Sequence, residues 1–332
     1  MLDLTKLKIV KEVGRPGFHF CLARLPEGER LLYGSSDGKL SEIDLAAEKP
    51  EAKEWGAHES YVTGLAMVGS QAVSVGYDGR MIWWDIASRA QARSIVAHDR
   101  WIRSVAATPD GKLLITVADD MLTKLWNAAT GELVLVLSNH LPQTPHHYPS
   151  MLYAVAVSND GKLLATGDKV GHVVVSELPS GKKLAEIEAP IMYTWDPVQR
   201  RHSIGGIRSL AFSPDGKQLA VGGMGKVGNI DHLEGMARVE IFDAASGARL
   251  HEFPGDKAKG LVERLIYHPS GEWVLATGGD NKGFLQFYDA RAGKLLHQIE
   301  APMHIHSLAL DTERSRIYAV GAERIVVWQL GG

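Results

Sequence analysis

Cysteine is almost absent from this chain of 332 residues, because Cys21 is its only one. A single thiol cannot form a disulfide within the chain, which excludes a disulfide-stabilised fold and fits a reducing compartment. No run approaches the ~18 consecutive apolar residues of a membrane span, and the N-terminal segment lacks the apolar core of a secretory signal. We therefore expect a cytoplasmic protein that does not contact a membrane.

The sequence also lacks an excess of charge of either sign and lacks catalytic signatures. Lys and Arg total 36 against 39 Asp and Glu, a formal charge of -3, so that nucleic acid is not an expected partner. No nucleophile elbow, zinc-protease motif or phosphate-binding loop is present, and the glycine-rich stretch Gly222–Lys226 is interpreted as a flexible loop. The sequence thus predicts no enzyme and no cofactor.

What the sequence does contain is a repeated pattern, clearest between His98 and His140. Four short apolar segments rich in Val, Ile, Leu and Thr are separated there by turn residues such as Pro-Asp-Gly and Thr-Gly. The segments are 102–107, 113–117, 122–126 and 133–137. Short apolar runs with this punctuation are typical of strands joined by tight turns, here four antiparallel strands in about forty residues.

The same pattern recurs along the chain. The position of Trp126 is matched at intervals of 40 to 66 residues by Ile43, Trp84, Ser176, Phe242, Tyr288 and Trp328. These positions define seven repeat units. A four-stranded sheet with two apolar faces is stable only when neighbouring sheets cover both faces. The sequence therefore predicts an all-β fold, a seven-bladed β-propeller of four-stranded antiparallel blades.

The predicted propeller is a single domain covering residues 1–332. Its blades are expected at about 17–54, 55–96, 97–138, 150–188, 204–253, 260–300 and 304–332. The last unit lacks its outer strand, and an alternating segment at about 7–13 is available to supply it. We expect this segment to pair with Ile325–Leu330 and close the ring.

Units two and three resemble the WD-repeat family of β-propellers. In that family a His, a Ser or Thr, an Asp and a Trp form a hydrogen-bonded chain that pairs buried polar groups. The resemblance assigns these structural roles to His58, Ser74, Asp78 and Trp84, and to His98, Thr116, Asp120 and Trp126. In both units the Asp follows the hydroxyl by four residues and precedes the Trp by six.

Three insertions interrupt the repeats: Leu141–Ser150, Ala189–Ser203 and Met224–Met236. In a four-stranded blade the entry loop and the loop between the second and third strands emerge on the same side. All three insertions are therefore expected on one face over blades four and five, and long loops of this kind are often functional.

The resemblance implies that partners bind on this same face. In protein interfaces generally, Trp, Tyr and Arg side chains most often dominate the binding energy. The candidate partner-binding residues are Tyr61, Trp101, Arg103, Tyr153, Tyr193, Trp195, Arg200, Arg201, Arg208, His304 and His306. The leading hypothesis is a non-enzymatic scaffold that binds a protein or peptide there, as a monomer or as a subunit of a larger complex.

The alternative hypothesis is a propeller enzyme, or a small-ligand or metal sensor, that uses the central channel. His304 and His306 share one face of a strand and are able to contact a metal or an anion. A second set of possible metal ligands is interpreted instead as polar loop residues: His140, His146, His147, His202, Asp231 and His232. No metal site is predicted.

Overall fold

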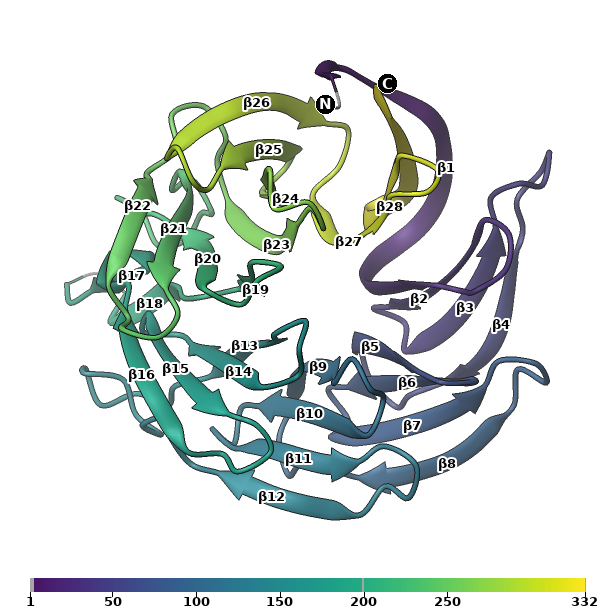
Figure 1. The fold of residues 1–332 in the computed structure, drawn as a ribbon, viewed down its shortest axis with the longest axis horizontal. Helices are drawn as coiled ribbons and strands as arrows, with labels where there is room; N and C mark the ends of the chain where they lie inside the picture. Colours follow the sequence, from purple (N-terminus) through teal and green to yellow (C-terminus); the bar gives the residue numbers. More distant parts are fainter. Residues whose placement is uncertain (1–2, 199, 332) are drawn as a thin grey trace.

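The computed structural model describes residues 3–198 and 200–331, and its regular secondary structure is almost entirely antiparallel strands. The sheets follow one another around a ring (Figure 1). The helical element found in the described residues is a single 3-10 turn, η1 (Pro190–Met192). Within that part of the chain, no helix is long and apolar enough to cross a bilayer.

Five sheets of the ring have four strands each, with the strands in sequence order from one edge to the other. The first two are β5 (Val62–Val68), β6 (Gln71–Gly76), β7 (Arg80–Asp85), β8 (Gln91–Val96), and β9 (Ile102–Ala107), β10 (Leu113–Ala118), β11 (Thr123–Asn127), β12 (Leu133–Leu137). The next is β13 (Leu152–Val157), β14 (Leu163–Asp168), β15 (His172–Glu177), β16 (Lys183–Glu188). The last two are β19 (Ser209–Phe212), β20 (Gln218–Met224), β21 (Ala237–Asp243), β22 (Arg249–Phe253), and β23 (Leu261–Tyr267), β24 (Val274–Gly279), β25 (Gly283–Asp289), β26 (Lys294–Ala301). A separate hairpin of β17 (Tyr193–Asp196) and β18 (His202–Gly205) lies in the second insertion.

The sixth large sheet joins the two ends of the chain, which lie together in Figure 1. Its order is β27 (Ile305–Asp311), β28 (Arg316–Gly331), β1 (Asp3–Arg24), β2 (Arg30–Ser35), β3 (Lys39–Asp44) and β4 (Ala52–Ala57). Within it Ile9 lies opposite Trp328, and Val13 lies opposite Ile325. The predicted closure of the ring by the N-terminal strand is confirmed.

The structure divides the ring differently from the predicted seven separate sheets, because β1 is continuous. One half of β1 pairs with β28 and the other half pairs with β2, with an irregular register between Gly14 and Phe18. The strands expected for the first and last blades therefore belong to one six-stranded sheet, and the ring contains six large sheets.

The strand β28 turns back on itself. Sixteen extended residues would span ~50 Å, yet the Leu330 N–H donates to the Ser315 carbonyl at 2.7 Å. Glu323, between the two halves, has a positive φ of 61°, as a tight turn requires. The two halves of β28 therefore lie side by side, and the second half accepts β1 along its other edge.

The core lies between neighbouring sheets, and the inner strands are buried on both faces. Val73 and Val75 on β6, for example, pack in one cluster with Ile102 on β9 and Leu114 on β10. Burial of each such side chain contributes about 1.5–3 kcal/mol. Because every sheet is covered by the next one, closure of the ring buries surfaces that an open array would expose.

The first part of the glycine-rich stretch is a strand, which corrects the interpretation from sequence, whereas Gly225 and Lys226 follow the strand as loop residues. Gly222 and Gly223 lie inside β20, in the ladder with β21. A Cβ at Gly222 would lie 2.6 Å from a methyl carbon of Val262 on the next sheet, closer than real contacts allow. Glycine is required there because the two sheets approach closely.

Candidate functional site on the channel face

The polar side chains assigned to structural roles in the second unit form a connected chain. The Nε2 atom of His58 lies 2.7 Å from Ser74 Oγ, and its Nδ1 atom lies 2.9 Å from an Asp78 oxygen. Trp84 Nε1 donates to the same Ser74 hydroxyl at 2.8 Å. The third unit repeats these contacts among His98, Thr116, Asp120 and Trp126 at 2.7–2.9 Å. These groups satisfy one another in the interior.

His140 is part of a similar chain, contrary to its interpretation as a polar loop residue. It is buried, with Nε2 2.9 Å from Thr166 Oγ1 and Nδ1 3.0 Å from Asp168 Oδ2. Here the Asp follows the hydroxyl by two residues instead of four, and Ser176 replaces the Trp. The sequence spacing therefore concealed this chain.

The innermost strands carry an irregularity at one equivalent position. In six of them the pairing with the neighbouring strand shifts by one residue, which leaves one residue without an opposite partner. These bulge residues are Phe20, Thr63, Arg103, Tyr153, Glu263 and His306. A bulge re-aims the side chain that it carries. These six residues, together with Arg208 just before β19, line a cavity of about 310 Å³ among the inner strands.

Aromatic rings form a continuous rim beside this cavity. Phe20 stacks on Tyr61 with ring centroids 5.4 Å apart, and Tyr61 stacks on Tyr77 at 5.4 Å. Tyr77 stacks on Trp101 at 4.4 Å with planes only 6° apart. Tyr61 and Trp101 remain 43% and 49% exposed although they are large and apolar. We call Phe18, Phe20, Tyr61, Tyr77 and Trp101 the aromatic rim.

Arg103 lies beneath the rim and is engaged within the protein. Its guanidinium makes two contacts of 2.7 Å with Asp119 and also donates to the Tyr77 hydroxyl. Burial lowers the pKa of Arg103, but the hydrogen bond and charge of Asp119 outweigh this effect and raise it. The guanidinium also lies 5.2 Å from the ring of Tyr153, which Arg208 covers from 3.8 Å. Arg103 and Tyr153 therefore build the cavity wall.

The first and second insertions are joined by aromatic contacts. His146 stacks on Trp195 at 4.4 Å, and its Nδ1 atom lies 3.0 Å from the Tyr193 hydroxyl. Tyr148 adds a tilted contact with Trp195 at 5.1 Å. Tyr193 and Trp195, both predicted partner-binding residues, thus hold the two insertions together, and both stay partly exposed.

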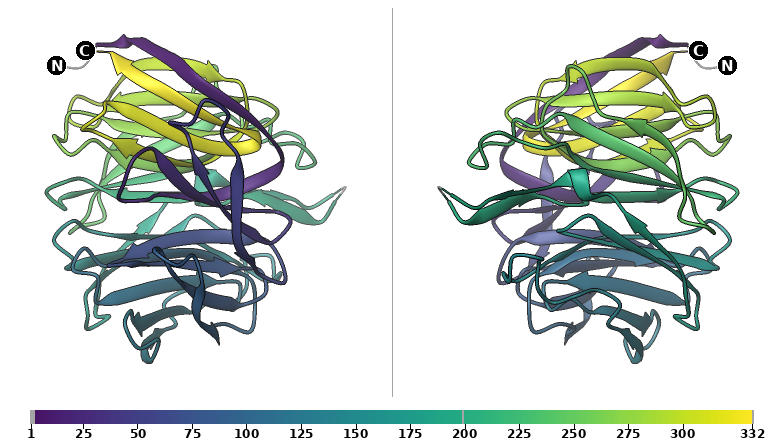
Figure 2. Two further views of the ribbon diagram at one scale, coloured as in Figure 1. Left: turned by 90° about the vertical axis from the view of Figure 1, so that its right-hand side faces the viewer. Right: turned by 90° about the vertical axis from the view of Figure 1, so that its left-hand side faces the viewer.

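The second and third insertions also meet. The backbone N–H of Val227 donates to Thr194 Oγ1 at 3.2 Å, and Arg200 forms an ion pair with Asp231. Ile204 packs against an apolar cluster of the third insertion. The three insertions therefore form one body, from which the β17–β18 hairpin projects beyond the ring (Figure 2). Arg201 is exposed near the tip of that hairpin.

The structure does not bring the loop histidines together as a metal site, since His140, His146 and Asp231 have the separate partners described above. Within residues 3–198 and 200–331, the group of three donors that could hold an ion is Glu263, His304 and His306. Sequence reasoning had selected the two histidines but had not selected Glu263. It had also missed Tyr77, Phe18 and Phe20 of the aromatic rim.

A closed ring of antiparallel sheets around a central cavity defines a β-propeller. A model of the family described as "WD domain, G-beta repeat" matches residues 90–127 and 195–227. The first match contains His98, Thr116, Asp120 and Trp126. The chain is thus similar to the WD-repeat family of β-propellers, as the resemblance of units two and three indicates.

Two relatives illustrate how distant the similarity is. Telomerase protein component 1 of Mus musculus is 26% identical over 267 residues, which cover 78% of this chain and 9% of that protein. Eukaryotic translation initiation factor 3 subunit I of Scheffersomyces stipitis is 26% identical over 212 residues, which cover 62% of this chain and 53% of that protein. The chain thus spans about half of one relative and a small part of the other.

Proposed function

We propose that this protein is a non-enzymatic scaffold that binds a protein or peptide partner on its channel face. By channel face we mean the aromatic rim and the body formed by the three insertions. The observation that carries the proposal is the rim itself, where Phe18, Tyr61 and Trp101 are 51%, 43% and 49% exposed beside the central cavity. Exposed aromatic side chains held rigidly by their neighbours are typical anchors of protein interfaces.

The comparisons support this proposal at the level of the family. The relatives' names describe a component of telomerase and a subunit of an initiation factor, which are parts of assemblies. We extend to this chain only the general role of a subunit that contacts other proteins. We also propose a cytoplasmic location, because the single cysteine fits a reducing compartment.

We also propose that the six-stranded sheet functions as two blades, giving seven repeated units in all. The hairpin within β28, together with β27 and the first half of β1, supplies four strands. The second half of β1 with β2, β3 and β4 supplies another four. Each half of this sheet then contributes one bulge residue, Phe20 or His306, to the cavity, as each four-stranded sheet contributes one residue.

Comparative capture tests the proposed binding face. Wild type, Trp101→Ala and Leu250→Ala are immobilised, incubated with extract of the source cell, and the retained proteins are quantified by mass spectrometry. Leu250 is the control because it is a similarly exposed apolar residue, at 44%, on the outer strand β22. We expect at least one protein to be retained equally by wild type and Leu250→Ala and at least ten-fold less by Trp101→Ala. Equal retention of every captured protein by all three contradicts the proposal.

A further inference from the structure

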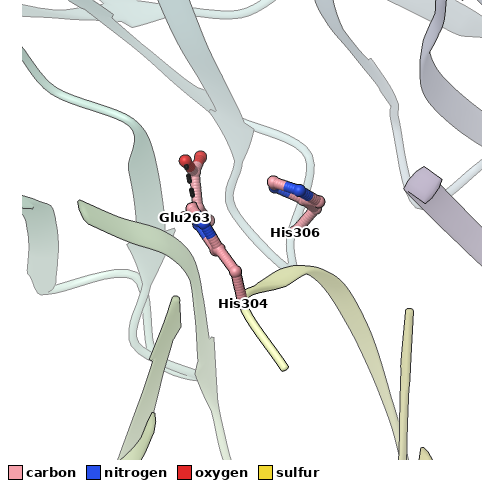
Figure 3. Close-up of side chains that lie close together, drawn as sticks. All are labelled: Glu263, His304 and His306. Carbon is pink, nitrogen blue, oxygen red and sulfur yellow. Dashed lines mark ion pairs between the residues drawn. The ribbon is translucent and has the colours of Figure 1, made fainter. Parts of the chain in front are cut away.

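Two neighbouring parts of the ring bring three metal-binding side chains together at the cavity. Glu263 lies on β23, His306 lies on β27, and His304 lies immediately before β27. One donor atom from each side chain lies within 4.8 Å of the others. Figure 3 shows the Glu263 carboxylate beside the His304 ring, with the ring of His306 directed toward the same space.

The distance between His304 and Glu263 is longer than a hydrogen bond and close to the separation of two ligands of one ion. His304 Nε2 lies 3.6 Å from Glu263 Oε1, beyond the 2.7–3.2 Å of an ordinary hydrogen bond. Two donors bound tetrahedrally to Zn²⁺ at 2.0–2.1 Å are separated by about 3.4 Å. The spacing of His304 and Glu263 is thus close to that of two ligands of one ion, and the donor atom of His306 lies within 4.8 Å of both.

Within the part of the chain that the structure describes, the Nε2 atoms of the two histidines lack hydrogen-bond partners, although Glu263 lies at ion-pair distance, 3.6 Å, from that of His304. The Nε2 atoms of His304 and His306 are shielded from solvent, and neither makes a hydrogen bond among the described residues. Buried polar atoms are nearly always paired, and each unpaired one costs about 1–3 kcal/mol. A bound cation would satisfy both nitrogens at once.

The fold holds these side chains in place from both sides. Glu263 and His306 are both bulge residues, and a bulge directs their side chains toward the cavity. The His304 carbonyl accepts the Ala322 N–H at 3.1 Å, and a Cβ at Gly321 would lie only 1.8 Å from that carbonyl oxygen. The backbone of His304 is thus held against β28 before any ligand binds.

The nearby guanidiniums of Arg208 and Arg264 add positive charge that acts on this group. They weaken the attraction for a cation and favour an anion in the remaining coordination position. Because Glu263, His306 and Arg208 all line the same cavity, such an anion has space beside the ion. The site is therefore suited to an ion that keeps one position open toward the cavity.

We propose that Glu263, His304 and His306 bind one divalent transition-metal ion, with Zn²⁺ the ion best matched to two imidazoles and one carboxylate. Three protein ligands leave one coordination position open to water or to a ligand in the cavity. This site does not depend on the proposed partner-binding role, because it uses none of the residues of the aromatic rim.

Calorimetric titration tests the site. The full chain, with any affinity tag removed and metal stripped with EDTA, is titrated with ZnCl₂; Co²⁺ then serves as a second probe through its visible absorption. We expect one saturable ion per chain, weakened more than ten-fold by His304→Ala, His306→Ala or Glu263→Gln. His232→Ala and Glu234→Gln are matched controls, since both side chains are exposed outside the site, and they should bind as wild type does.

Folding of each variant is checked by circular dichroism and thermal melting. Glu263→Gln keeps the shape of the side chain, so it decides the question if a histidine variant fails to fold. Wild type should also melt at higher temperature when Zn²⁺ is present, because a ligand that binds the native state stabilises it. No saturable binding of Zn²⁺ up to about 1 mM, or equal binding by Glu263→Gln and Glu234→Gln, overturns the proposal.

Discussion

The rings of Tyr77 and Trp101 stack with their centroids 4.4 Å apart and their planes within 6° of parallel. Tyr77 follows β6 and Trp101 precedes β9, so the stack connects two adjacent sheets at the edge of the cavity. Tyr77 is in turn fixed by the Arg103 guanidinium, which donates to its hydroxyl. An exposed indole is thereby held in one orientation, and a rigid aromatic anchor loses little conformational entropy on binding.

We predict that Trp101 and Arg103 differ in what they contribute, although they are close in sequence. Trp101→Ala should reduce the free energy of unfolding by only about 1 kcal/mol, the value of an aromatic pair at a half-exposed position. Arg103→Gln should cost about 3 kcal/mol, because Asp119 then loses the cation that it contacts at 2.7 Å. Chemical denaturation measures both. A larger loss for Trp101→Ala than for Arg103→Gln would contradict the assignment of Arg103 to the cavity wall.

The hydroxyl at the centre of the His–Thr–Asp–Trp chain should be important for stability. Thr116→Val keeps the shape of the side chain but removes the partner of both His98 Nε2 and Trp126 Nε1. We expect a loss of about 2 kcal/mol or more in the free energy of unfolding, since unpaired buried groups cost about 1–3 kcal/mol each. Thr116→Ser retains the hydroxyl and is the control. Equal stability of the Val and Ser variants would show that these hydrogen bonds contribute nothing.

Acid should destabilise the protein partly through Asp78. Burial opposes ionisation of this carboxyl, but the hydrogen bond and charge of His58 lower its pKa below the ordinary value of 3.8. A carboxyl with a lowered pKa stabilises the native state fully above the unfolded pKa, and the contribution is lost as pH falls through the folded value. Melting temperatures between pH 6 and pH 2 should therefore fall less steeply below about pH 4 for Asp78→Asn than for wild type. Parallel pH profiles would exclude this role.

Closure of the ring should depend on the N-terminal strand. Deleting residues 3–13 removes most of the pairing with β28 and the contacts of Leu4 and Leu7 with the core. We expect the melting temperature to fall on the order of 5–10 °C, as a loss of several kcal/mol produces in a domain of this size. Glu12→Gln is the control, because its ion pair with Arg324 is partly exposed and should contribute at most about 1 kcal/mol. An unchanged melting curve for the deletion would refute closure as a source of stability.

The sequence was sufficient for the propeller and its closure because turn residues recur at each unit and the last unit visibly lacks a strand. It was insufficient for the division into sheets, since nothing in residues 14–18 shows that β1 runs on unbroken. His140 was misinterpreted because its acid partner, Asp168, stands two residues after Thr166 instead of four. A rule that fixes the number of residues between the hydroxyl and the Asp cannot detect an Asp at another position near the turn.

The candidate site was predicted in part for a similar reason. His304 and His306 are two residues apart, so their shared position was evident, whereas Glu263 lies some forty residues earlier in another sheet. Arg103, Tyr153, Arg208 and His306 were selected for their chemistry. Superposing the repeats at the bulge position would also have found Phe20 and Glu263, because six of the inner strands present one residue to the cavity there.

The most direct test of the central claim, that the channel face binds the partner, is hydrogen–deuterium exchange of the protein with and without its captured partner. The account predicts slower exchange on binding in three backbone regions of that face: residues 58–62, residues 77–80 and residues 98–103, together with the insertion at 193–205. The outer strands β8, β12 and β22 should exchange at the same rates in both states. Protection confined to the outer strands, with these four segments unchanged, would contradict the account.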